Sequence, residues 1–487
     1  MGRFKKEILN KDGIDIRDVG YYSTPSFIAN YISEELIKLN PNGRKALDPA
    51  VGKEELLPVF IDNGITIDSY DIVNYNCIKR SNFTNKDFIL HYINEKTNIP
   101  INKKLRWDYD YYIANPPYNC HEIKFIKEHK LLLKNVFAGV GANNMYSLFL
   151  SAMIDVAKDG SLIGVIISDS FLTAKAHSGL RQQILNNCAI HQLLLCPTSL
   201  FSSQKADVRT CIIILQKGTS YQKQIKILNR PESLKHLEDA LRTKNFKEVD
   251  LSDLMLPNSK SGEQFIIDAP ADIISLFSNP RIKDQYKCVT GISTGNDKKY
   301  LSKDKKEGFN IPFYKNPGKS KFYSVPDAYI IDDYIDESRR VKDFMVRNKN
   351  LMGTEGITCS SMGIPFSTCY LPPNVTFGVN ASIFPKKEDI FWLISYLNSS
   401  LVTYFVRGVL TRSNMITSGY VSQIPLLDFD LDVKSKLSVI ACDVLNGKLQ
   451  QVDAIKRIDL IVNKSAKISI ESVKLISDFS EQIQKKV

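Results

Sequence analysis

Four consecutive residues, Asn115-Pro116-Pro117-Tyr118, carry side chains suited to chemistry on an aromatic amine. The nitrogen of such an amine is a poor nucleophile because its lone pair is delocalised into the ring. Two acceptors aimed at the amino hydrogens, the Asn115 side-chain oxygen and the Pro116 carbonyl, favour a tetrahedral nitrogen with a free lone pair. The prolines stiffen the loop, and Tyr118 offers a flat face for a base. The pattern predicts reaction at an exocyclic amino group, and its plain alternative is a proline-rich turn with an asparagine cap.

Acidic residues upstream predict a pocket for a nucleotide-like cofactor. The turn at 47–52 follows a predicted strand and precedes a helical stretch, which suits the amino-acid end of such a cofactor. Asp71 ends the next strand, where an acidic side chain accepts hydrogen bonds from ribose hydroxyls. Asp87 and Phe88 pair an acceptor for an adenine amino group with an apolar face for its ring. Each aspartate also has a structural interpretation: Asp48 as a helix cap, Asp71 as a strand end and Asp87 as a turn residue.

These residues need a scaffold that brings them together, and the first part of the chain predicts one. Short β-rich runs alternate with helical stretches, which is typical of a parallel sheet covered by helices, and open sheets bind ligands at the carboxyl ends of their strands. Thr24 as cap and Pro25 at the first helical position predict the start of a helix. The predicted helices include 25–39 and 147–157, and the predicted strands are 46–48, 65–72, 111–114, 162–168, 193–196 and 210–216.

The sequence predicts an α/β domain followed by a mixed α+β domain and a helical tail. The apolar stretch 390–406 is interrupted by polar residues at 398, 399, 400 and 403, so it predicts a buried helix and not a membrane span. The predicted boundaries give a catalytic domain at 1–225, a linker at 226–262, a second domain at 263–430 and a tail at 431–487.

The composition favours a polyanionic partner and a reducing compartment. The 487 residues carry a formal net charge of +11, which suits nucleic acid, although a lysine-rich chain can also become basic by compositional drift. The nine cysteines form no CxxC pair and no Cys/His cluster, so the sequence predicts neither a disulfide framework nor a metal site. The N-terminal segment lacks an apolar signal core. We therefore expect a cytoplasmic protein of prokaryotic type with no membrane contact.

Taken together, these segments resemble the gamma class of DNA adenine-N6 methyltransferases from restriction-modification systems. In that class a cofactor-capping motif comes first, then the cofactor turn, then the Asn-Pro-Pro-Tyr motif, and a target-recognition domain last. This chain has the same order, with Tyr22-Ser23-Thr24-Pro25 ahead of the turn at 48–52 and of 115–118, and the specific motifs extend to residue 217. The resemblance implies a Rossmann-like methyltransferase fold with a mostly parallel sheet, S-adenosyl-L-methionine as cofactor and double-stranded DNA as partner.

The resemblance also implies roles for individual residues. Asn115, Pro116 and Tyr118 hold the target adenine, and Phe201 stacks on its other face after the base has left the duplex. One departure concerns the cofactor turn, where the class usually has a second glycine and this chain has Gly52-Lys53-Glu54. The residues implied to contact the cofactor are Thr24, Asp48, Ala50, Gly52, Asp71, Ile72, Asp87, Phe88 and Pro117.

The C-terminal half resembles the recognition domain of the class more loosely. A loop at 291–297 precedes basic and aromatic residues that suit phosphate contacts and base or sugar packing. The alternative is a solvated lysine surface over a small β-rich core. The residues concerned are Lys298, Lys299, Lys303, Lys305, Lys306, Tyr314, Lys315, Lys319, Lys321, Phe322 and Tyr323.

Other functions stay open at this point. Similar motifs occur in methyltransferases that act on RNA bases or on protein glutamine, and a DNA-specificity protein with a catalytically weak methyltransferase fold is a further alternative. Cytosine-N4 transfer generally has serine in place of Asn115, and cytosine-C5 transfer needs a cysteine after a proline, whereas here Cys196 precedes Pro197. We expect a modification enzyme of a restriction-modification system or an orphan epigenetic enzyme. It would act as a monomer on DNA, with a separate cognate restriction endonuclease as a further partner.

Overall fold

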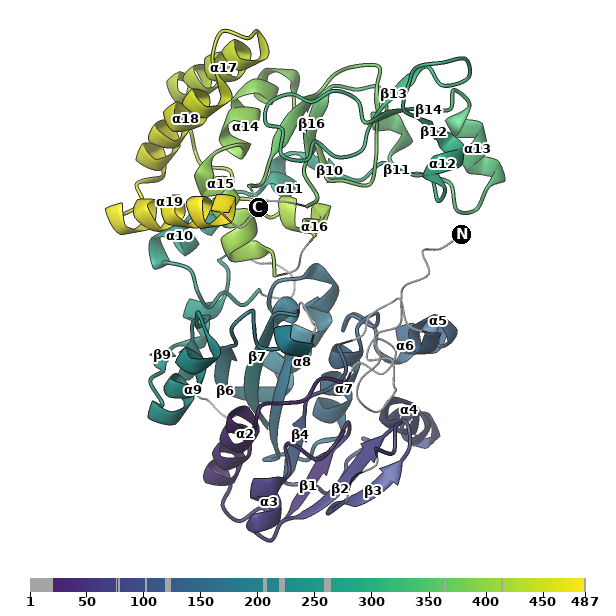
Figure 1. Ribbon diagram of the computed structural model, residues 1–487, viewed down its shortest axis with the longest axis vertical. Helices are drawn as coiled ribbons and strands as arrows, with labels where there is room; N and C mark the ends of the chain where they lie inside the picture. The colour runs from purple at the N-terminus through teal and green to yellow at the C-terminus, as the bar shows by residue number, and fades with distance from the viewer. Residues whose placement is uncertain are drawn as a thin grey trace. The chain divides into compact units, whose positions relative to one another are not determined.

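The chain folds into two compact units, Met1–Asp268 and Ala269–Val487 (Figure 1). The computed structural model describes residues 21–75, 77, 79–100, 103–118, 124–204, 208–218, 224–257, 264–362, 365–412 and 415–485. Within these ranges no helix combines the length and the apolar character that a bilayer span requires.

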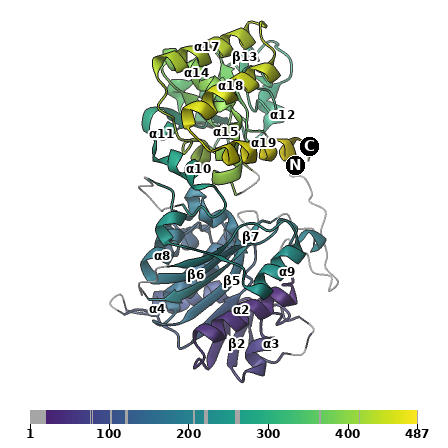
Figure 2. The same cartoon turned by 90° about the vertical axis from the view of Figure 1, so that its left-hand side faces the viewer.

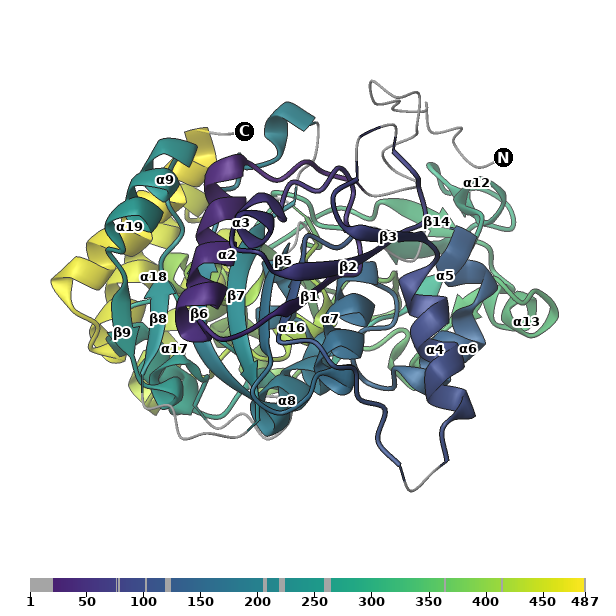
Figure 3. The same cartoon turned by 90° about the horizontal axis from the view of Figure 1, so that it is seen from below.

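The first unit is built on a nine-stranded sheet that is mostly parallel. β7 runs antiparallel between β5 and β6, and β9 runs antiparallel to β8 at one edge, whereas the other neighbours are parallel. Figure 3 shows the strands side by side from β9 to β3. In spatial order they are β3 (Asn82–Asn85), β2 (Thr66–Asp71), β1 (Lys45–Asp48), β4 (Tyr111–Ala114), β5 (Leu162–Ser168), β7 (Thr210–Lys217), β6 (Cys188–Leu195), β8 (Ile225–Leu228) and β9 (Lys247–Val249).

Helices cover both faces of this sheet, because its central strands are apolar on both sides (Figure 2). In β4, Tyr111 and Ile113 pack with α2, α3 and α9, whereas Tyr112 and Ala114 pack with α4, α7 and α8. Strands buried on both faces are typical of parallel sheets. The first set is α2 (Ser26–Leu39), α3 (Pro58–Asp62) and α9 (Leu234–Thr243), and the second is α4 (Phe88–Asn98), α7 (Met145–Val156) and α8 (Ser178–Asn187), with α5 (Lys124–Glu128) and α6 (Lys130–Val136) between α4 and α7 in the chain.

The predicted α/β class is confirmed, with one change in its extent. Five predicted strands coincide with β1, β2, β4, β5 and β7 to within one residue at each end. The segment 226–262, expected to be a linker, instead carries all but the first residue of β8, together with α9 and β9, and belongs to the first unit. β8 pairs with β6, and Leu237 and Leu241 of α9 are buried. Because β8 and the edge strand β9 are short and carry charged residues, their pattern resembles that of a connector.

The second unit contains two four-stranded sheets, a two-stranded sheet and a group of helices. The stretch expected to be a buried helix forms α14 and α15, and all but one of the eight residues of α14 are buried. The sheets are β10 (Lys287–Val289), β19 (Ser382–Phe384), β16 (Gly356–Cys359) and β17 (Thr368–Leu371); β12 (Leu301–Ser302), β14 (Ala328–Ile330), β13 (Ile311–Tyr314) and β18 (Thr376–Phe377); and β11 (Ile292–Ser293) with β15 (Met345–Val346).

The predicted helical tail is present, and it packs on the helices that precede it. α17 lies against α14, and α19 lies against α15. The helices of this unit are α10 (Ala271–Ser275), α11 (Ile282–Gln285), α12 (Asp297–Tyr300), α13 (Tyr334–Arg340), α14 (Ile390–Leu397), α15 (Ser400–Tyr404), α16 (Ser418–Val421), α17 (Leu431–Leu445), α18 (Gln451–Ala466) and α19 (Ile470–Lys485).

The position of the unit boundary can be tested by truncation. A fragment ending at Asp268 should unfold cooperatively, whereas one ending at Ile225 should not fold, as judged by circular dichroism during heating. Each buried apolar side chain is worth about 1.5–3 kcal/mol, so the shorter fragment loses free energy comparable to the whole stability of a domain, about 5–15 kcal/mol. Equal melting of the two fragments would contradict the boundary. The buried side chains lost are Ile227, Leu237, Leu241, Val249, Leu254, Phe265 and Ile267.

Candidate active site

The topology of the sheet brings the predicted site residues to one edge. β2, β1, β4 and β5 are parallel neighbours, so their carboxyl ends lie on the same side. Asp71 and Asp48 are the last residues of β2 and β1, Ser168 is the last residue of β5, and Asn115 directly follows β4. Ligands of open α/β sheets bind at this edge. The predicted catalytic and cofactor residues are therefore neighbours in the fold although they are distant in the sequence.

The side chain of Asn115 is oriented by the segment that precedes α2. Its Nδ2 donates hydrogen bonds to the carbonyl oxygen of Tyr22 at 2.8 Å and to Oγ1 of Thr24 at 2.9 Å. Both amide hydrogens are thus used, which fixes the direction in which Oδ1 points. Of the two prolines that follow Asn115, Pro116 is buried and Pro117 is half-buried.

Thr24 therefore has a different role from the helix cap that the sequence predicts. α2 begins at Ser26 with Pro25 as its N-cap, and no side chain caps the helix. The Thr24 hydroxyl accepts from Asn115 instead, and the residue is only 6% exposed. The helix begins one residue later than expected, which leaves the Thr24 hydroxyl available to the loop that carries Asn115.

Gln204 is a site residue that sequence reasoning missed. Its Oε1 accepts from the backbone N–H of Ser23 at 2.8 Å, and its Nε2 donates to the Ser23 carbonyl at 2.9 Å. This paired contact fastens the segment that holds Asn115 to the turn that follows Phe201. The two residues are 181 positions apart in the chain, and no local pattern in the sequence signals such a pairing.

Three aromatic rings form a cluster next to Asn115. Tyr118, Phe201 and Tyr22 are mutually in contact, with ring centroids 5.7–5.8 Å apart and tilted planes. Phe201 is fully buried, and Tyr118 fills the space beside it. Burial raises the pKa of the Tyr118 hydroxyl well above its usual range, so this hydroxyl stays protonated and acts as a donor.

The hydroxyl of Tyr118 uses the acceptor that was predicted to serve a substrate. Its Oη donates to Asn115 Oδ1 at 2.7 Å and also lies 3.1 Å from the carbonyl oxygen of Ile166 in β5. In this arrangement the predicted acceptor and the predicted stacking ring satisfy each other. A donor that takes the same lone pair of Oδ1 would displace the Tyr118 hydroxyl.

The predicted cofactor turn is closely tied to Asp71. The Asp48 Oδ1 accepts from the Ala50 N–H at 3.0 Å, and the Asp71 Oδ2 accepts from the Gly52 N–H at 2.8 Å. Asp71 Oδ1 also accepts from the Val73 N–H. Asp71 thus combines its strand-end position with a direct contact to the turn. Burial raises the pKa of Asp48 well above its usual range, and it also raises that of Asp71.

The remaining predicted cofactor residues divide into exposed and buried ones. Ile72 is 57% exposed, so its side chain is available to a ligand. Asp87 caps α4 by accepting from the Leu90 N–H at 2.9 Å. Phe88 is 1% exposed and stacks on Phe149 at 5.3 Å, so it belongs to the core beneath the site. Its direct contact with a cofactor stays a prediction.

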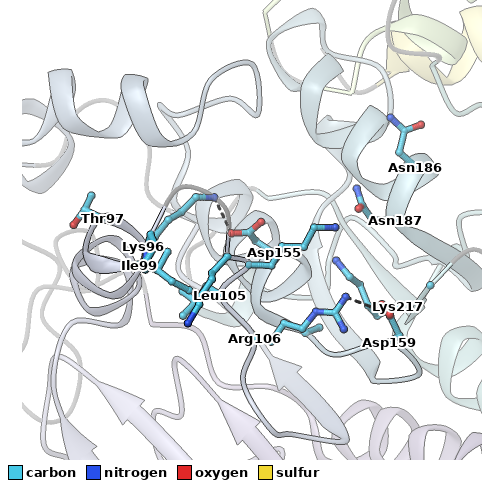
Figure 4. A pocket seen from close by; sticks show the side chains of 15 residues that line it. Lys96, Thr97, Ile99, Leu105, Arg106, Asp155, Asp159, Asn186, Asn187 and Lys217 are labelled. Carbon is cyan, nitrogen blue, oxygen red and sulfur yellow. Dashed lines mark hydrogen bonds and ion pairs between the residues drawn. The ribbon is translucent and has the colours of Figure 1, made fainter.

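A pocket of about 640 Å³ lies at the opposite edge of the sheet (Figure 4). Its lining residues come from the segments that lead into β4 and β5 and from the end of β7, and α4, α7 and α8 all end beside it. Three of its cations have local partners: Lys96 binds Asp155 at 2.7 Å, Arg106 binds Asp159 at 3.3 Å, and Lys217 donates to a carbonyl of α7. Cations near the carboxyl ends of helices are stabilising, so this basic pocket has a structural explanation.

Among the residues that the structure describes, no group of three or more His, Cys, Asp or Glu side chains could hold a metal ion. The eight cysteines in the described ranges are all free thiols. Cys196 is fully buried, and burial raises the pKa of its thiol to about 12. The site consists of amide, carbonyl, carboxylate and aromatic groups.

Two curated proteins resemble part of the chain. The Type II methyltransferase M.BanIII of Aneurinibacillus aneurinilyticus is 30% identical over 219 residues, which are 38% of this chain and 37% of that protein. The Type II methyltransferase M.BsuBI of Bacillus subtilis is 33% identical over 117 residues, which are 24% of this chain and 22% of that protein. The chain therefore covers well under half the length of each of these relatives.

Solved structures share the fold along most of the chain. The Type IIL restriction-modification enzyme MmeI, solved in complex with DNA, has a TM-score of 0.58 at 11% identity over 97% of this chain and 79% of its own. The DrdV–DNA complex has a TM-score of 0.56 at 11% identity over 89% and 58%. At this identity the likeness establishes the fold alone. The model of one family, described as N-6 DNA Methylase, matches residues 14–260, just over half of the chain. With the motifs assembled at one sheet edge, this match shows that the chain belongs to the N-6 DNA methylase family.

Proposed function

We propose that this protein is a site-specific DNA methyltransferase that modifies the N6 amino group of adenine in double-stranded DNA, with S-adenosyl-L-methionine as methyl donor. The observation that carries the proposal is the orientation of Asn115, whose two amide hydrogens are bound by Tyr22 and Thr24. The remaining oxygen is an acceptor of fixed direction at the carboxyl edge of the sheet. An acceptor held in advance is worth most where charge develops during a reaction.

The residues at this edge suit an adenine that has left the duplex. Oδ1 of Asn115 and the carbonyl of Pro116 would hold the two amino hydrogens, which localises the nitrogen lone pair. Tyr118 and Phe201 would contact the faces of the base once Tyr118 has moved. Flipping costs a few kcal/mol, and stacking on aromatic rings returns about 1–3 kcal/mol per base.

One buried oxygen atom without a partner supports the binding of the cofactor at the turn that follows β1. Oδ2 of Asp48 is buried and has no hydrogen-bond partner among the described residues. A buried carboxylate without a partner is costly, and the ammonium group of an amino-acid-like ligand would supply the missing donors. Asp71 and Ile72 would contact the nucleoside part. When bound, S-adenosyl-L-methionine supplies an electrophilic methyl group on a sulfonium centre.

The second unit carries the positive charge expected of a DNA-recognition domain, although less of the 298–323 stretch is available than expected. Tyr314 is 6% exposed and Phe322 is fully buried, so both belong to the core. Lys321 donates to the Asn398 carbonyl at 2.7 Å, and burial lowers its pKa to about 8. Tyr323 is 56% exposed. With it, the exposed lysines that we propose for phosphate contacts are Lys298, Lys303, Lys305, Lys306 and Lys319.

Replacement of Asn115 tests the reaction. Asn115→Ala should lower turnover by a factor of about 10²–10³, the usual effect of losing one oriented polar group, while DNA binding persists. The measurement is methyl transfer to DNA with analysis of the nucleosides for N6-methyladenine. Asn63→Ala is the matched control, because the Asn63 side chain only donates to the Val59 carbonyl on the surface. Activity of Asn115→Ala within a few-fold of wild type, or methylation of a different base, would contradict the proposal.

Two replacements of Tyr118 separate its ring from its hydroxyl. Tyr118→Phe keeps the ring and releases Asn115 Oδ1, so turnover should stay within a few-fold and KM for DNA should not rise. Tyr118→Ala removes the stacking face and should weaken a base–protein contact worth about 1–3 kcal/mol. The readout is turnover together with the fluorescence of 2-aminopurine at the target position, which rises as the base unstacks. An equal loss in both variants would mean that the hydroxyl itself takes part in the chemistry.

Asp48→Asn should have opposite effects on stability and on cofactor binding. The pKa of Asp48 is raised in the folded state, so the folded protein keeps the Asp48 proton to higher pH than the unfolded chain does. The free energy of unfolding therefore falls as the pH rises above the pKa of an unfolded aspartate, about 3.9. The ligand-free variant should therefore melt at a higher temperature than wild type near neutral pH, with the difference closing near pH 4. Cofactor affinity should fall about tenfold or more, since a charged hydrogen bond is worth about 1.5–3 kcal/mol.

Asp110→Asn is the matched control, because its expected change in melting temperature has the opposite sign. Hydrogen bonds from Arg44, Lys158 and Lys45 outweigh the effect of burial and lower the pKa of Asp110. Its ionised form therefore stabilises the folded state above the unfolded value, and the variant should melt lower than wild type near neutral pH with unchanged cofactor affinity. A lower melting temperature for Asp48→Asn near neutral pH would refute the assignment of Asp48.

A further inference from the structure

Glu54 stands in the cofactor turn in a backbone conformation that favours glycine. Its φ angle is +65°, and that of Gly52 is +53°. The related class usually has a second glycine in this turn, and Glu54 adopts the left-handed conformation that a glycine tolerates without strain. A side chain at such a position costs free energy and persists only where its surroundings hold it in place.

The carboxylate of Glu54 has the contacts that hold it there. It is a residue with only 4% exposure, and it accepts from the Arg80 N–H at 2.9 Å, from the Ser81 N–H at 3.0 Å and from Ser81 Oγ at 2.6 Å. Burial alone would raise the pKa of Glu54, but the hydrogen bonds from Ser81 and Arg80 outweigh it and lower the pKa. The group is therefore an ionised acceptor that links the turn to the segment before β3.

The same segment holds the other end of the turn. Lys79 Nζ donates to the Gly52 carbonyl at 2.6 Å, and the Gly52 N–H donates to Asp71. Ser81 Oγ lies 2.6 Å from Ser69 Oγ in β2. Residues 79–81 thus fix the turn at 52 and at 54 and connect it to the strand that ends in Asp71.

We propose that Glu54 is a positioning residue that braces the cofactor turn, so that its carboxylate replaces the second glycine as the feature that sets the shape of the turn. The inference rests on the proposed function, because it assumes that this turn binds S-adenosyl-L-methionine. It predicts that restoring a glycine here does harm: the backbone strain is relieved, but the acceptor that attaches the turn to Arg80 and Ser81 is lost.

The order of affinities among three variants distinguishes the brace from a simple backbone requirement. The dissociation constant of S-adenosyl-L-methionine is measured by calorimetry on the full chain, well below the melting temperature of each variant. If Glu54 braces the turn, Glu54→Gln, which keeps one acceptor oxygen, should bind the cofactor several-fold more weakly than wild type. Glu54→Gly should bind it at least tenfold more weakly than wild type. Glu54→Ala should bind most weakly, because it loses the acceptor and keeps the strain. If the turn requires only a left-handed residue, Glu54→Gly binds as tightly as wild type or more tightly, and the inference is overturned.

Two further measurements exclude a general loss of structure. Lys467→Gly relieves another non-glycine left-handed residue, φ +52° at the exposed carboxyl end of α18, and should leave cofactor affinity unchanged. Ser81→Ala should weaken cofactor binding in wild type but add little in the Glu54→Gly background, because both changes remove the same hydrogen bond between Ser81 Oγ and Glu54. At saturating cofactor, Glu54→Gly should recover kcat to within a few-fold while its KM for the cofactor is raised.

Failure of the inference differs from failure of the proposed function. If wild type binds the cofactor and Glu54→Gly binds it equally well, only the brace is wrong. If wild type, with a normal melting curve, shows no binding of S-adenosyl-L-methionine at millimolar concentration, the proposed cofactor and the brace are both wrong. Additive effects of Ser81→Ala and Glu54→Gly would also count against the brace.

Discussion

The direction of a single carboxamide organises this site. Asn115 donates both of its amide hydrogens to residues 22 and 24, so its oxygen can face only one way. The segment that accepts them is held by Gln204, which follows Phe201 by three residues. The catalytic loop after β4, the approach to α2 and the turn after β6 therefore support one another. Such a network is worth more than its separate bonds, because each contact keeps the partners of the next in place.

The cofactor side of the site follows a similar principle with charged groups. Asp48 at the end of β1 and Asp71 at the end of β2 both accept from N–H groups at 50–52 in the cofactor turn, and Glu54 in the same turn accepts from the segment before β3. Two of these carboxyl groups have raised pKa values and one has a lowered value. The difference reflects their partners: Glu54 is fully hydrogen-bonded by its own chain, whereas Asp48 keeps one oxygen without a partner among the described residues. Protein contacts thus satisfy the structural carboxylate and leave the other available to a ligand.

Much of the first unit was predictable, because its central strands are buried on both faces and appear as continuous apolar runs. β4 and β5 have the predicted bounds, and the motif after β4 lies where the interpretation of it requires. β3, β8 and β9 were missed because they are short and carry polar residues, which are exposed in β3 and β9. The pairing of Ser23 with Gln204 and the contacts of Glu54 join residues that no periodicity relates. Phe88 shows a further limit of sequence reasoning, since a core phenylalanine and a ligand-contacting one have the same pattern.

The hydrogen bond between Tyr118 and Asn115 has a consequence for hydration. An exposed amide oxygen would be solvated, and a substrate would have to strip water from it before binding. Here the Tyr118 hydroxyl already donates to this oxygen, so under the proposed function an arriving amino group would exchange one direct hydrogen bond for another. Under the proposed function, the Tyr118 hydroxyl would take the place of a water molecule when the chain folds, so that this water need not be removed at each turnover. Rotation of the Tyr118 ring would then expose the acceptor under the proposed function, and this motion could be repeated without rebuilding the solvent around it.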